Sequence, residues 1–200
     1  MNNRQWILAR RPQGKCVAED FLFREDAFEV PPLADGEILL RNMAFLCAPT
    51  IRNWMDAPGK NLIPSISLGE PVRGPCAARV IASSHPDFPA GSRVCTTSPW
   101  QDHAVVSPAS VLVRPIPDGC SFVDALGPLG LNALTAFFGL LEVGQPKSGE
   151  TLLVSGAAGS VGSSVAQIGR IMGCRVVGIA GGKEKCERQR NNGIVDYCIN

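Results

Sequence analysis

Residues Thr151 to Gly182 read TLLVSGAAGSVGSSVAQIGRIMGCRVVGIAGG, and this stretch decides the fold of the second half of the chain. Its first part, Thr151–Ser155, is an apolar run of strand length, which is typical of a strand covered on both faces of a sheet. From Ser160 to Met172 the apolar residues follow helical spacing. Because Arg175–Ala180 repeats the pattern of a buried strand, the stretch predicts a β-α-β unit with parallel strands.

A glycine-rich turn joins the first predicted strand to the predicted helix. Its candidate cofactor-binding residues are Gly156, Gly159, Ser160, Val161 and Gly162. Glycines allow a sharp turn and a close approach of the backbone to a pyrophosphate, whose charge the helix N-terminus stabilises. The spacing GxxGxxG differs from the commoner GxGxxG, and a purely structural turn is the alternative. The strand-turn-helix context favours a dinucleotide site.

The end of the second predicted strand indicates which dinucleotide is bound. An NAD-binding protein usually places Asp or Glu there, but this chain has Gly181 and Gly182, followed by Lys183 and Lys185. No carboxylate would repel a 2′-phosphate, and cations are available to hold one. We therefore expect NADPH rather than NADH, with Gly181 and Lys185 at its adenosine end. The alternative is that both lysines belong to a solvated helix start.

The residues before this stretch follow a different pattern of apolar and turn-forming residues. From Arg4 to Pro115 short β-prone runs alternate with turn-forming residues, which predicts a small barrel or sandwich. From Phe122 to Val143 the chain is rich in Leu, Ala and Phe, as expected for one or two helices broken near Gly127-Pro128. We therefore divide the chain into a first domain, 1–120, and a second, 121–200. A helix over Lys183–Asn192 and a third strand from Tyr197 are predicted to follow the β-α-β unit.

Composition limits the classes of partner. The 200 residues carry a net charge of +1, which gives no electrostatic reason to expect nucleic acid or an anionic membrane as partner. No apolar run reaches the roughly 18 residues of a membrane helix, and early arginines interrupt any signal-peptide core, so we expect a cytoplasmic protein. The eight cysteines include no CxxC pair and there are two histidines, so we expect free thiols and no metal site.

Several motifs resemble a known family. They are IRNWM at Ile51–Met55, PWQDH at Pro99–His103, and the long run from Leu134 to Cys186, which contains LTAFFGLLEVG and the glycine turn. Together they resemble the zinc-independent prostaglandin reductase, leukotriene hydroxydehydrogenase and curcumin reductase branch of the medium-chain dehydrogenase/reductase superfamily. The resemblance implies an α/β fold, with an N-terminal GroES-like β-barrel domain followed by an incomplete Rossmann domain with a parallel sheet.

The same resemblance implies the chemistry. Family members use NADPH to reduce the C=C bond of α,β-unsaturated carbonyl compounds, passing hydride to the β-carbon while a hydrogen bond stabilises the enolate oxygen. It implies that the 2′-phosphate binds Lys185. Thr135, in the linking helix, is a candidate cofactor contact; otherwise its hydroxyl bonds back to its own turn. Small-molecule enones or alkenals are the expected substrates, and no residue is assigned a catalytic role.

Two departures from the family concern single segments, one near the substrate and one near the nicotinamide. Thr50 stands where relatives have a tyrosine, so its shorter hydroxyl makes substrate preference uncertain. Trp100 is expected to form an apolar wall, and both residues are candidate substrate-lining residues. His103 is expected in a surface strand rather than as a general acid. The segment Gly130–Ala133, GLNA, stands where the family has GMPG at the start of the linking helix, and is expected to alter packing near the nicotinamide.

The last departure is length. Family members are longer, so the chain is expected to lack part of the nicotinamide pocket and the usual dimer edge, and a homodimer is expected only where that part is present. An unfinished parallel sheet leaves apolar faces and strand edges unpaired, which predicts weak stability. Two alternatives to the enone reductase remain: a catalytically silent truncated homologue, and a quinone reductase of the same superfamily.

Overall fold

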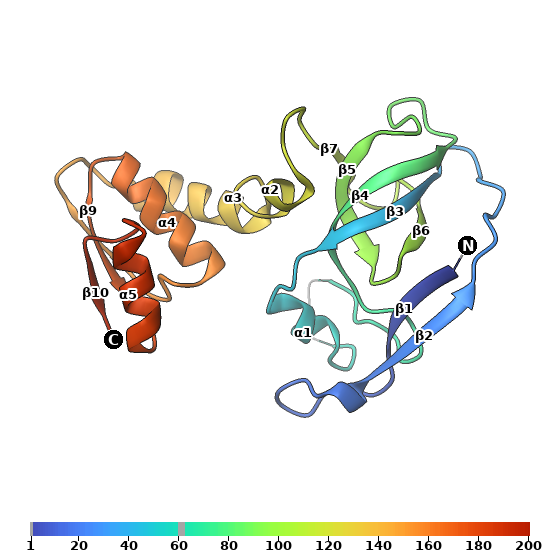
Figure 1. Cartoon of the computed structure of the whole chain (residues 1–200), viewed down its shortest axis with the longest axis horizontal. Coiled ribbons are helices and arrows are strands. Elements are labelled where there is room, and N and C mark those ends of the chain that lie inside the picture. Colours follow the sequence, from blue (N-terminus) through green and yellow to red (C-terminus); the bar gives the residue numbers. More distant parts are fainter. Residues whose placement is uncertain (1, 60–62) are drawn as a thin grey trace. The chain divides into compact units, whose positions relative to one another are not determined.

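The computed structural model describes residues 2–59 and 63–200, which form two compact units, Met1–Leu126 and Gly127–Asn200. Residues 1 and 60–62 of the predicted first domain lie outside this description. The first unit consists mainly of antiparallel strands, and the second alternates strands with helices (Figure 1). This confirms the predicted α/β fold, with an antiparallel β domain first and a parallel sheet second.

Two antiparallel sheets build the described part of the N-terminal unit. In the smaller sheet, β1 (Asn2–Leu8) pairs with β2 (Phe21–Ala27), and a short 3-10 helix, η1 (Ala18–Asp20), precedes β2. The larger sheet has the order β6-β3-β4-β5-β7. Its strands are β3 (Ile38–Phe45), β4 (Arg73–Ser83), β5 (Arg93–Pro99), β6 (His103–Val106) and β7 (Arg114–Pro115).

The core of this unit follows from strand alternation. Ile38 and Leu40 of β3 point to one face, where they pack with Val80 and Val94 of the neighbouring strands, and all four are fully buried. The register between β3 and β4 shifts between Leu39 and Leu40 and again between Asn42 and Ala44. These irregularities bend β3 and change which side chains its second half presents to each face.

Two short helices complete the N-terminal unit. Helix α1 (Thr50–Trp54) follows β3, and helix α2 (Phe122–Leu126) follows β7. The start of α2 is capped reciprocally: the Asp124 N–H donates to the Ser121 hydroxyl (3.0 Å), and the Ser121 N–H donates to the Asp124 carboxylate (2.9 Å). The apolar side of α2 packs against β4 and β5 residues, so α2 belongs structurally to the first unit although it lies beyond residue 120.

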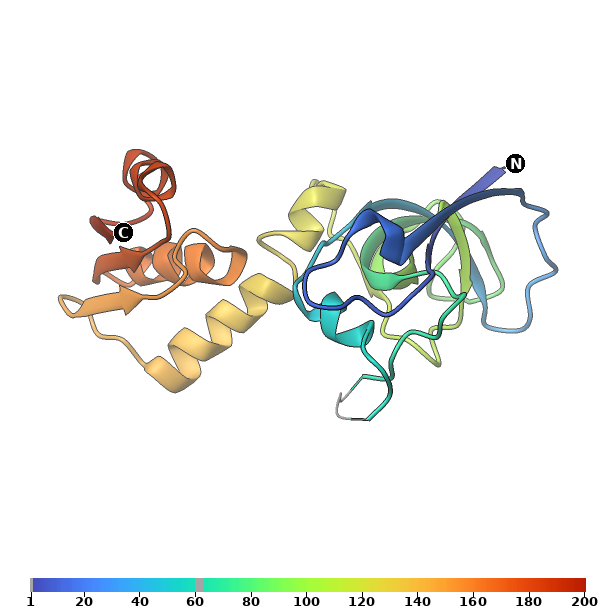
Figure 2. The same cartoon turned by 90° about the horizontal axis from the view of Figure 1, so that it is seen from below.

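The C-terminal unit starts with helix α3 (Leu131–Phe138), which continues without a break into a π-helical turn, η2 (Gly139–Gly144) (Figure 2). Strands β8 (Thr151–Val154), β9 (Arg175–Ile179) and β10 (Tyr197–Ile199) then form a parallel sheet in the order β10-β9-β8. Helices α4 (Ser160–Ile171) and α5 (Lys183–Asn191) connect them.

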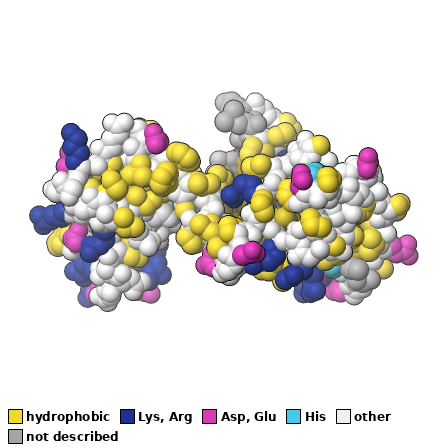
Figure 3. Space-filling view, turned by 90° about the horizontal axis from the view of Figure 1, so that it is seen from above, with side chains coloured by type: hydrophobic (Ala, Val, Ile, Leu, Met, Phe, Trp, Pro, Cys, Tyr) yellow, Lys and Arg dark blue, Asp and Glu magenta, His cyan; other side chains and the backbone are white. Residues whose placement is uncertain are grey.

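The faces of the parallel sheet differ in coverage. Val154 and Val176 pack against Ala166 of α4 and are buried, whereas Leu153 is 60% and Ile199 45% exposed. Figure 3 shows hydrophobic side chains gathered on one face of this unit. The expectation that the first strand is covered on both faces is therefore wrong for the described chain, because the helices α4 and α5 bury one side of the strands only.

Candidate functional site

The glycine turn between β8 and α4 has a defined backbone geometry. Gly156 adopts a left-handed conformation with φ of 58°, which favours glycine, and its carbonyl accepts a hydrogen bond from the Gly159 N–H at 2.8 Å. The Ala157 N–H donates to the carbonyl of Ile179 at 3.0 Å. These bonds hold the turn against the end of β9, at the carboxyl edge of the sheet.

Gly162 lets the first turn of α4 approach the loop closely. A Cβ at this position would lie 2.3 Å from the Gly156 carbonyl oxygen, so no other residue fits without moving backbone. Gly159 is the N-cap residue, and no side chain in the described structure hydrogen-bonds to cap this end of the helix. The helix therefore begins with bare N–H groups and the positive end of its dipole, the chemistry that binds anions.

A pocket of about 490 Å³ opens at this turn. We call it the glycine-loop pocket; its lining residues are Leu153, Val154, Ser155, Gly156, Gly159, Val161, Gly162 and Val165. The structure thus brings together four of the five residues predicted in the loop. The fifth, Ser160, does not line the pocket.

Ser160 takes part instead in a contact that the sequence did not predict. The Asn132 side-chain amide of α3 donates to the Ser160 hydroxyl at 3.0 Å, and thereby joins the start of α3 to the start of α4. Asn132 belongs to the segment GLNA, which departs from the family pattern. No local pattern in the sequence indicates this contact, because the two residues lie 28 positions apart. The effect of GLNA on packing near the nicotinamide stays a prediction.

Gly181 and Lys185 lie at the other end of the predicted cofactor site. Gly181 is exposed, with no atom within 4 Å of the position a Cβ would take. Lys185 is exposed in the first turn of α5, and among the described residues it makes no ion pair. Lys183, in contrast, lies 3.7 Å from the Glu187 carboxylate. A free cation therefore stands at position 185.

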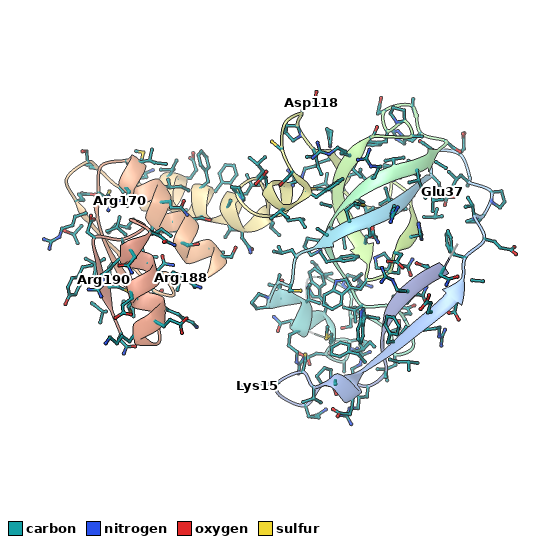
Figure 4. All side chains as sticks on the ribbon, viewed as in Figure 1. Lys15, Glu37, Asp118, Arg170, Arg188 and Arg190 are labelled. Atoms are coloured by element: carbon teal, nitrogen blue, oxygen red, sulfur yellow. The ribbon has the colours of Figure 1, made fainter. Side chains whose placement is uncertain are left out.

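The helices of this unit carry further cations. Arg170 projects from α4, and Arg188 and Arg190 project from α5 (Figure 4). Arg170 is paired with Asp196 at 2.5 Å, and Asp196 also accepts the Val176 N–H at 2.7 Å. This backbone hydrogen bond, together with Arg170, lowers the pKa of the Asp196 carboxyl.

Thr135, the remaining candidate cofactor contact, is exposed on α3. Its hydroxyl donates to the Leu131 carbonyl at 2.8 Å, which is the alternative expected from the sequence. The hydroxyl oxygen still has lone pairs, so it can accept a hydrogen bond but has used its donor.

In the N-terminal unit a second pocket, of about 420 Å³, contains Trp100. We call it the Trp100 pocket; its lining residues are Arg4, Trp6, Phe23, Asn42, Met43, Phe45, Cys47, Trp100, Gln101 and Asp102. Thr50, the other candidate substrate-lining residue, is exposed at the start of α1 and is not among them. Of the two candidates, only Trp100 lines this pocket.

His103 differs from its expected position in a surface strand. It is 9% exposed in β6, and its ring stacks on Phe28 with centroids 5.4 Å apart. Burial lowers the pKa of this imidazole, so the neutral form is favoured. The expectation failed because Phe28 lies 75 positions away in the sequence and gives no local signal of the stacking.

Across residues 2–59 and 63–200, no three His, Cys, Asp or Glu side chains form a group that could hold a metal ion. None of the helices in the same residues has the length and apolar character needed to cross a membrane.

The comparisons with known proteins agree with one another. Residues 4–113, more than half of the chain, match a family described as the N-terminal domain of oxidoreductase. The NADPH-dependent curcumin reductase of Escherichia coli (strain K12) is 41% identical over 98% of this chain, and prostaglandin reductase 1 of Oryctolagus cuniculus is 36% identical over 98%. The solved structure of CurA from Vibrio vulnificus in complex with NADPH covers 98% of the chain at 39% identity, with a TM-score of 0.86.

The chain spans 54–57% of the length of these relatives. Solved quinone reductases resemble it at 24% identity or lower, which shows the fold alone. The family match lies within the N-terminal unit, and the relatives match 98% of the chain, which includes the glycine turn. The chain therefore belongs to the oxidoreductase family defined by this N-terminal domain, in the prostaglandin reductase and curcumin reductase branch of the medium-chain dehydrogenase/reductase superfamily.

Proposed function

We propose that this chain carries the cofactor loop and substrate domain of an NADPH-dependent oxidoreductase that reduces the C=C bond of α,β-unsaturated carbonyl compounds. The observation that carries the proposal is the bare helix N-terminus at the glycine-loop pocket, with Lys185 as a free cation on the next helix. Relatives named as NADPH-dependent curcumin reductase and 2-alkenal reductase support the same activity.

The residues of the turn fit a dinucleotide pyrophosphate. Gly156 has no atom within 4 Å of the position a Cβ would take, so its backbone is open, and Gly162 lets α4 begin in close contact with the loop. In the proposed site the N–H groups of Ser160, Val161 and Gly162 donate to the phosphate oxygens, and the helix dipole adds to the attraction. The hydrogen bond from Asn132 fixes the Ser160 hydroxyl beside this anion site.

The adenosine end fits a 2′-phosphate better than free ribose hydroxyls. Gly181 leaves open space where an acidic residue would stand, and Lys185 has no competing carboxylate in the described chain. A 2′-phosphate dianion gains a charge-assisted hydrogen bond from this lysine, whereas the free 2′-hydroxyl of NADH offers it no charge.

When bound, NADPH supplies the hydride that adds to the β-carbon of the substrate. In this proposal Trp100 provides an apolar wall that excludes water, and Thr50 contributes a short hydroxyl at the substrate side. Thr135 can accept a hydrogen bond from the cofactor because its donor is used by Leu131. No side chain is assigned as proton donor. Enones and alkenals are the proposed substrates.

We place the reaction in the cytosol, since a reducing compartment keeps thiols such as those of Cys16 and Cys47 free. A homodimer is the proposed assembly for a chain as long as the relatives.

The test is equilibrium binding of NADPH and NADH to the purified chain, followed by nicotinamide fluorescence and thermal shift. We expect NADPH to bind more tightly, and Lys185→Glu to weaken NADPH binding by about tenfold or more, because a charge-assisted bond is replaced by repulsion. NADH binding should change little. Lys183→Glu is the matched control, since Lys183 lies on the same turn and already faces Glu187.

A folded chain that binds neither nucleotide contradicts the cofactor proposal and supports a catalytically silent homologue. Equal loss of NADPH binding in both lysine variants contradicts the specific role of Lys185. Consumption of NADPH upon addition of 2-cyclohexenone, with no consumption when the saturated ketone replaces it, tests the reduction itself.

A further inference from the structure

The segment between β1 and β2 forms a further pocket of the N-terminal unit, of about 340 Å³. We call it the Arg10–Lys15 pocket; its lining residues are Arg10, Arg11, Gln13, Lys15, Val17 and Asp20. Three of these side chains are cations and one is a carboxylate, and Lys15 is marked on the loop in Figure 4. Positive charge is therefore in excess at this pocket, although the whole chain has a net charge of only +1.

The carboxylate of the pocket is committed to the loop itself. Asp20 is 2% exposed, and its two oxygens accept hydrogen bonds from the Arg10 Nε at 2.7 Å and the Val17 N–H at 2.9 Å. The Val17 hydrogen bond, together with Arg10, lowers the pKa of the Asp20 carboxyl, so this group is ionised at neutral pH. Asp20 therefore holds Arg10 at the pocket and neutralises one of the three cations.

The cations keep donors for a ligand. Arg10 uses only its Nε, so its two terminal nitrogens have no acceptor among the described residues. One terminal nitrogen of Arg11 donates to the carbonyls of Met55 and Ile66, at 2.8 and 2.6 Å, and leaves the other guanidinium nitrogens without an acceptor in the same residues. Lys15 is exposed and makes no hydrogen bond or ion pair within residues 2–59 and 63–200. Guanidinium and ammonium groups with unused N–H bonds are the donors that bind oxyanions.

The backbone of the loop also favours an anion. Arg52 of α1 donates to the carbonyls of Pro12 and Gly14, at 2.8 and 3.0 Å, so these two acceptors are occupied. The N–H groups of Gln13, Gly14 and Lys15 donate to no acceptor in the part of the chain that the structure describes. Successive backbone N–H groups without internal acceptors bind anions in loops. The loop is thus held by Arg52 with its donors unused.

From these observations we infer that the Arg10–Lys15 pocket binds the phosphate group of a small molecule. The phosphate oxygens accept hydrogen bonds from the unused nitrogens of Arg10 and Arg11 and from the Lys15 ammonium. A dianion matches the positive charge that remains after Asp20 is counted. The volume, about 340 Å³, lies at the lower end of the range of small-molecule sites and accommodates free phosphate or a small phosphate ester. This binding is independent of the proposed reduction and is measured without NADPH.

Acetylation of Lys15 reports on the pocket directly, because a bound phosphate covers its amine. The experiment treats the purified chain with sulfo-N-hydroxysuccinimidyl acetate and follows acetylation of each lysine by peptide mass spectrometry. Potassium phosphate replaces potassium chloride at constant pH and ionic strength, so that general screening of charge is unchanged. At a phosphate concentration about ten times Kd, acetylation of Lys15 should slow about tenfold. Lys147, which is exposed in the C-terminal unit, should react at an unchanged rate.

Matched probes distinguish the chemistry and the source of the ligand. Acetate at the same ionic strength carries one charge fewer than the phosphate dianion and should protect Lys15 much less. Saturable protection of Lys15 by inorganic phosphate or by glycerol 3-phosphate supports the phosphate site. The probe with the lower half-saturating concentration shows whether the pocket prefers free phosphate or an ester.

A pair of arginine variants tests the lining. Arg10→Gln keeps an N–H group for Asp20 but removes the charge, and should raise the half-saturating phosphate concentration about tenfold. Arg24→Gln is the matched control, since Arg24 is an exposed residue of β2 outside the lining, and it should leave this concentration unchanged. Should Arg10→Gln fail to fold, the comparison of phosphate with acetate on the unmodified chain still decides the question.

Equal protection of Lys15 by acetate overturns the phosphate assignment. Equal slowing at Lys15 and Lys147, or no slowing at Lys15, overturns the site. The same loss of protection in Arg10→Gln and Arg24→Gln overturns the role of the lining arginine.

Discussion

The five-stranded sheet of the N-terminal unit and the parallel sheet of the C-terminal unit contain strands of similar apolar character, but their surroundings differ. In the N-terminal unit Ile38 and Leu40 are fully buried by the neighbouring strands of an antiparallel sheet. In the C-terminal unit Val176 is equally buried, yet Leu153 and Ile199 lie on an open face. Apolar strands are thus buried in the first unit, whereas in the second unit one face of the sheet stays exposed.

The comparison shows that an apolar strand sequence indicates side chains that can be buried. It does not indicate whether another element covers them. Parallel strands carry apolar residues toward both faces because helices normally cover both. Here α4 and α5 cover the side of Val154 and Val176, and within the described residues nothing covers Leu153 to the same extent. Side chains on the open face are therefore expected to contribute little to the stability of this chain.

The largest expected effect compares one leucine from each sheet. Leu40→Ala should reduce the free energy of unfolding of the N-terminal unit by about 2–5 kcal/mol, because it leaves a cavity in a closed core. Leu153→Ala should change stability by no more than about 0.5 kcal/mol, since the side chain is already exposed. Urea unfolding measures both. Tryptophan fluorescence follows the N-terminal unit, where all three tryptophans lie, and amide exchange of β9 follows the other. Similar losses of unfolding free energy in Leu40→Ala and Leu153→Ala would contradict the interpretation that Leu153 lies on an exposed face of the sheet.

A smaller effect on stability is expected from alanine substitutions at two glycines of the C-terminal unit. Gly162→Ala places a Cβ against the Gly156 carbonyl and should cost about 1–3 kcal/mol by overpacking, together with weaker NADPH binding. Gly181→Ala meets no atom within 4 Å and should change stability by less than about 1 kcal/mol. Thermal unfolding with and without NADPH distinguishes them. If Gly181→Ala destabilised the unit as much as Gly162→Ala, the close approach of Gly162 to the Gly156 carbonyl would not explain the loss of stability.

The smallest expected effect concerns acid. Arg4 lowers the pKa of Asp102 in the first unit, and the Val176 N–H, with Arg170, lowers that of Asp196 in the second. Each carboxylate therefore stabilises the folded state above its unfolded pKa of about 4, and this contribution is lost as the pH falls through the folded pKa. Urea midpoints from about pH 7 to about pH 3 should decline. Either substitution, Asp102→Asn or Asp196→Asn, should make this decline less steep. Each should change the pH-dependent loss of unfolding free energy by less than about 1 kcal/mol, because the ion pairs are partly exposed. If the urea midpoints of both variants declined with falling pH as steeply as those of the unchanged chain, other groups would be responsible for the loss of stability in acid.

Much of the C-terminal unit could be predicted because its signals are local. The helix expected over Ser160–Met172 is α4, Ser160–Ile171, and the second strand, expected over Arg175–Ala180, is β9, Arg175–Ile179. Helical spacing and continuous apolar runs act within a few residues, so neighbouring positions carry them. The glycine turn is equally local, and Gly156 has the positive φ that such a turn requires.

The candidate site could be predicted only in part. Asn132 reaches Ser160 across 28 positions, and His103 is buried through Phe28, 75 positions away. The register shift in β3 between Asn42 and Ala44 has no signature in the residues that form it. The roles of Lys185, Thr50, Trp100 and Thr135 stay predictions, and the nucleotide-binding experiment addresses that of Lys185.

By itself, the sequence determined the β-α-β unit, its glycine turn, the absence of a carboxylate after the second strand, and the family, because these depend on neighbouring residues or on motifs. The tertiary structure alone decided which face of the parallel sheet is covered, that α2 packs on the first unit, and that four aromatic rings meet in one pocket. The physical reason is that burial and pocket geometry arise between segments far apart in the chain, and no local pattern records which surfaces will meet.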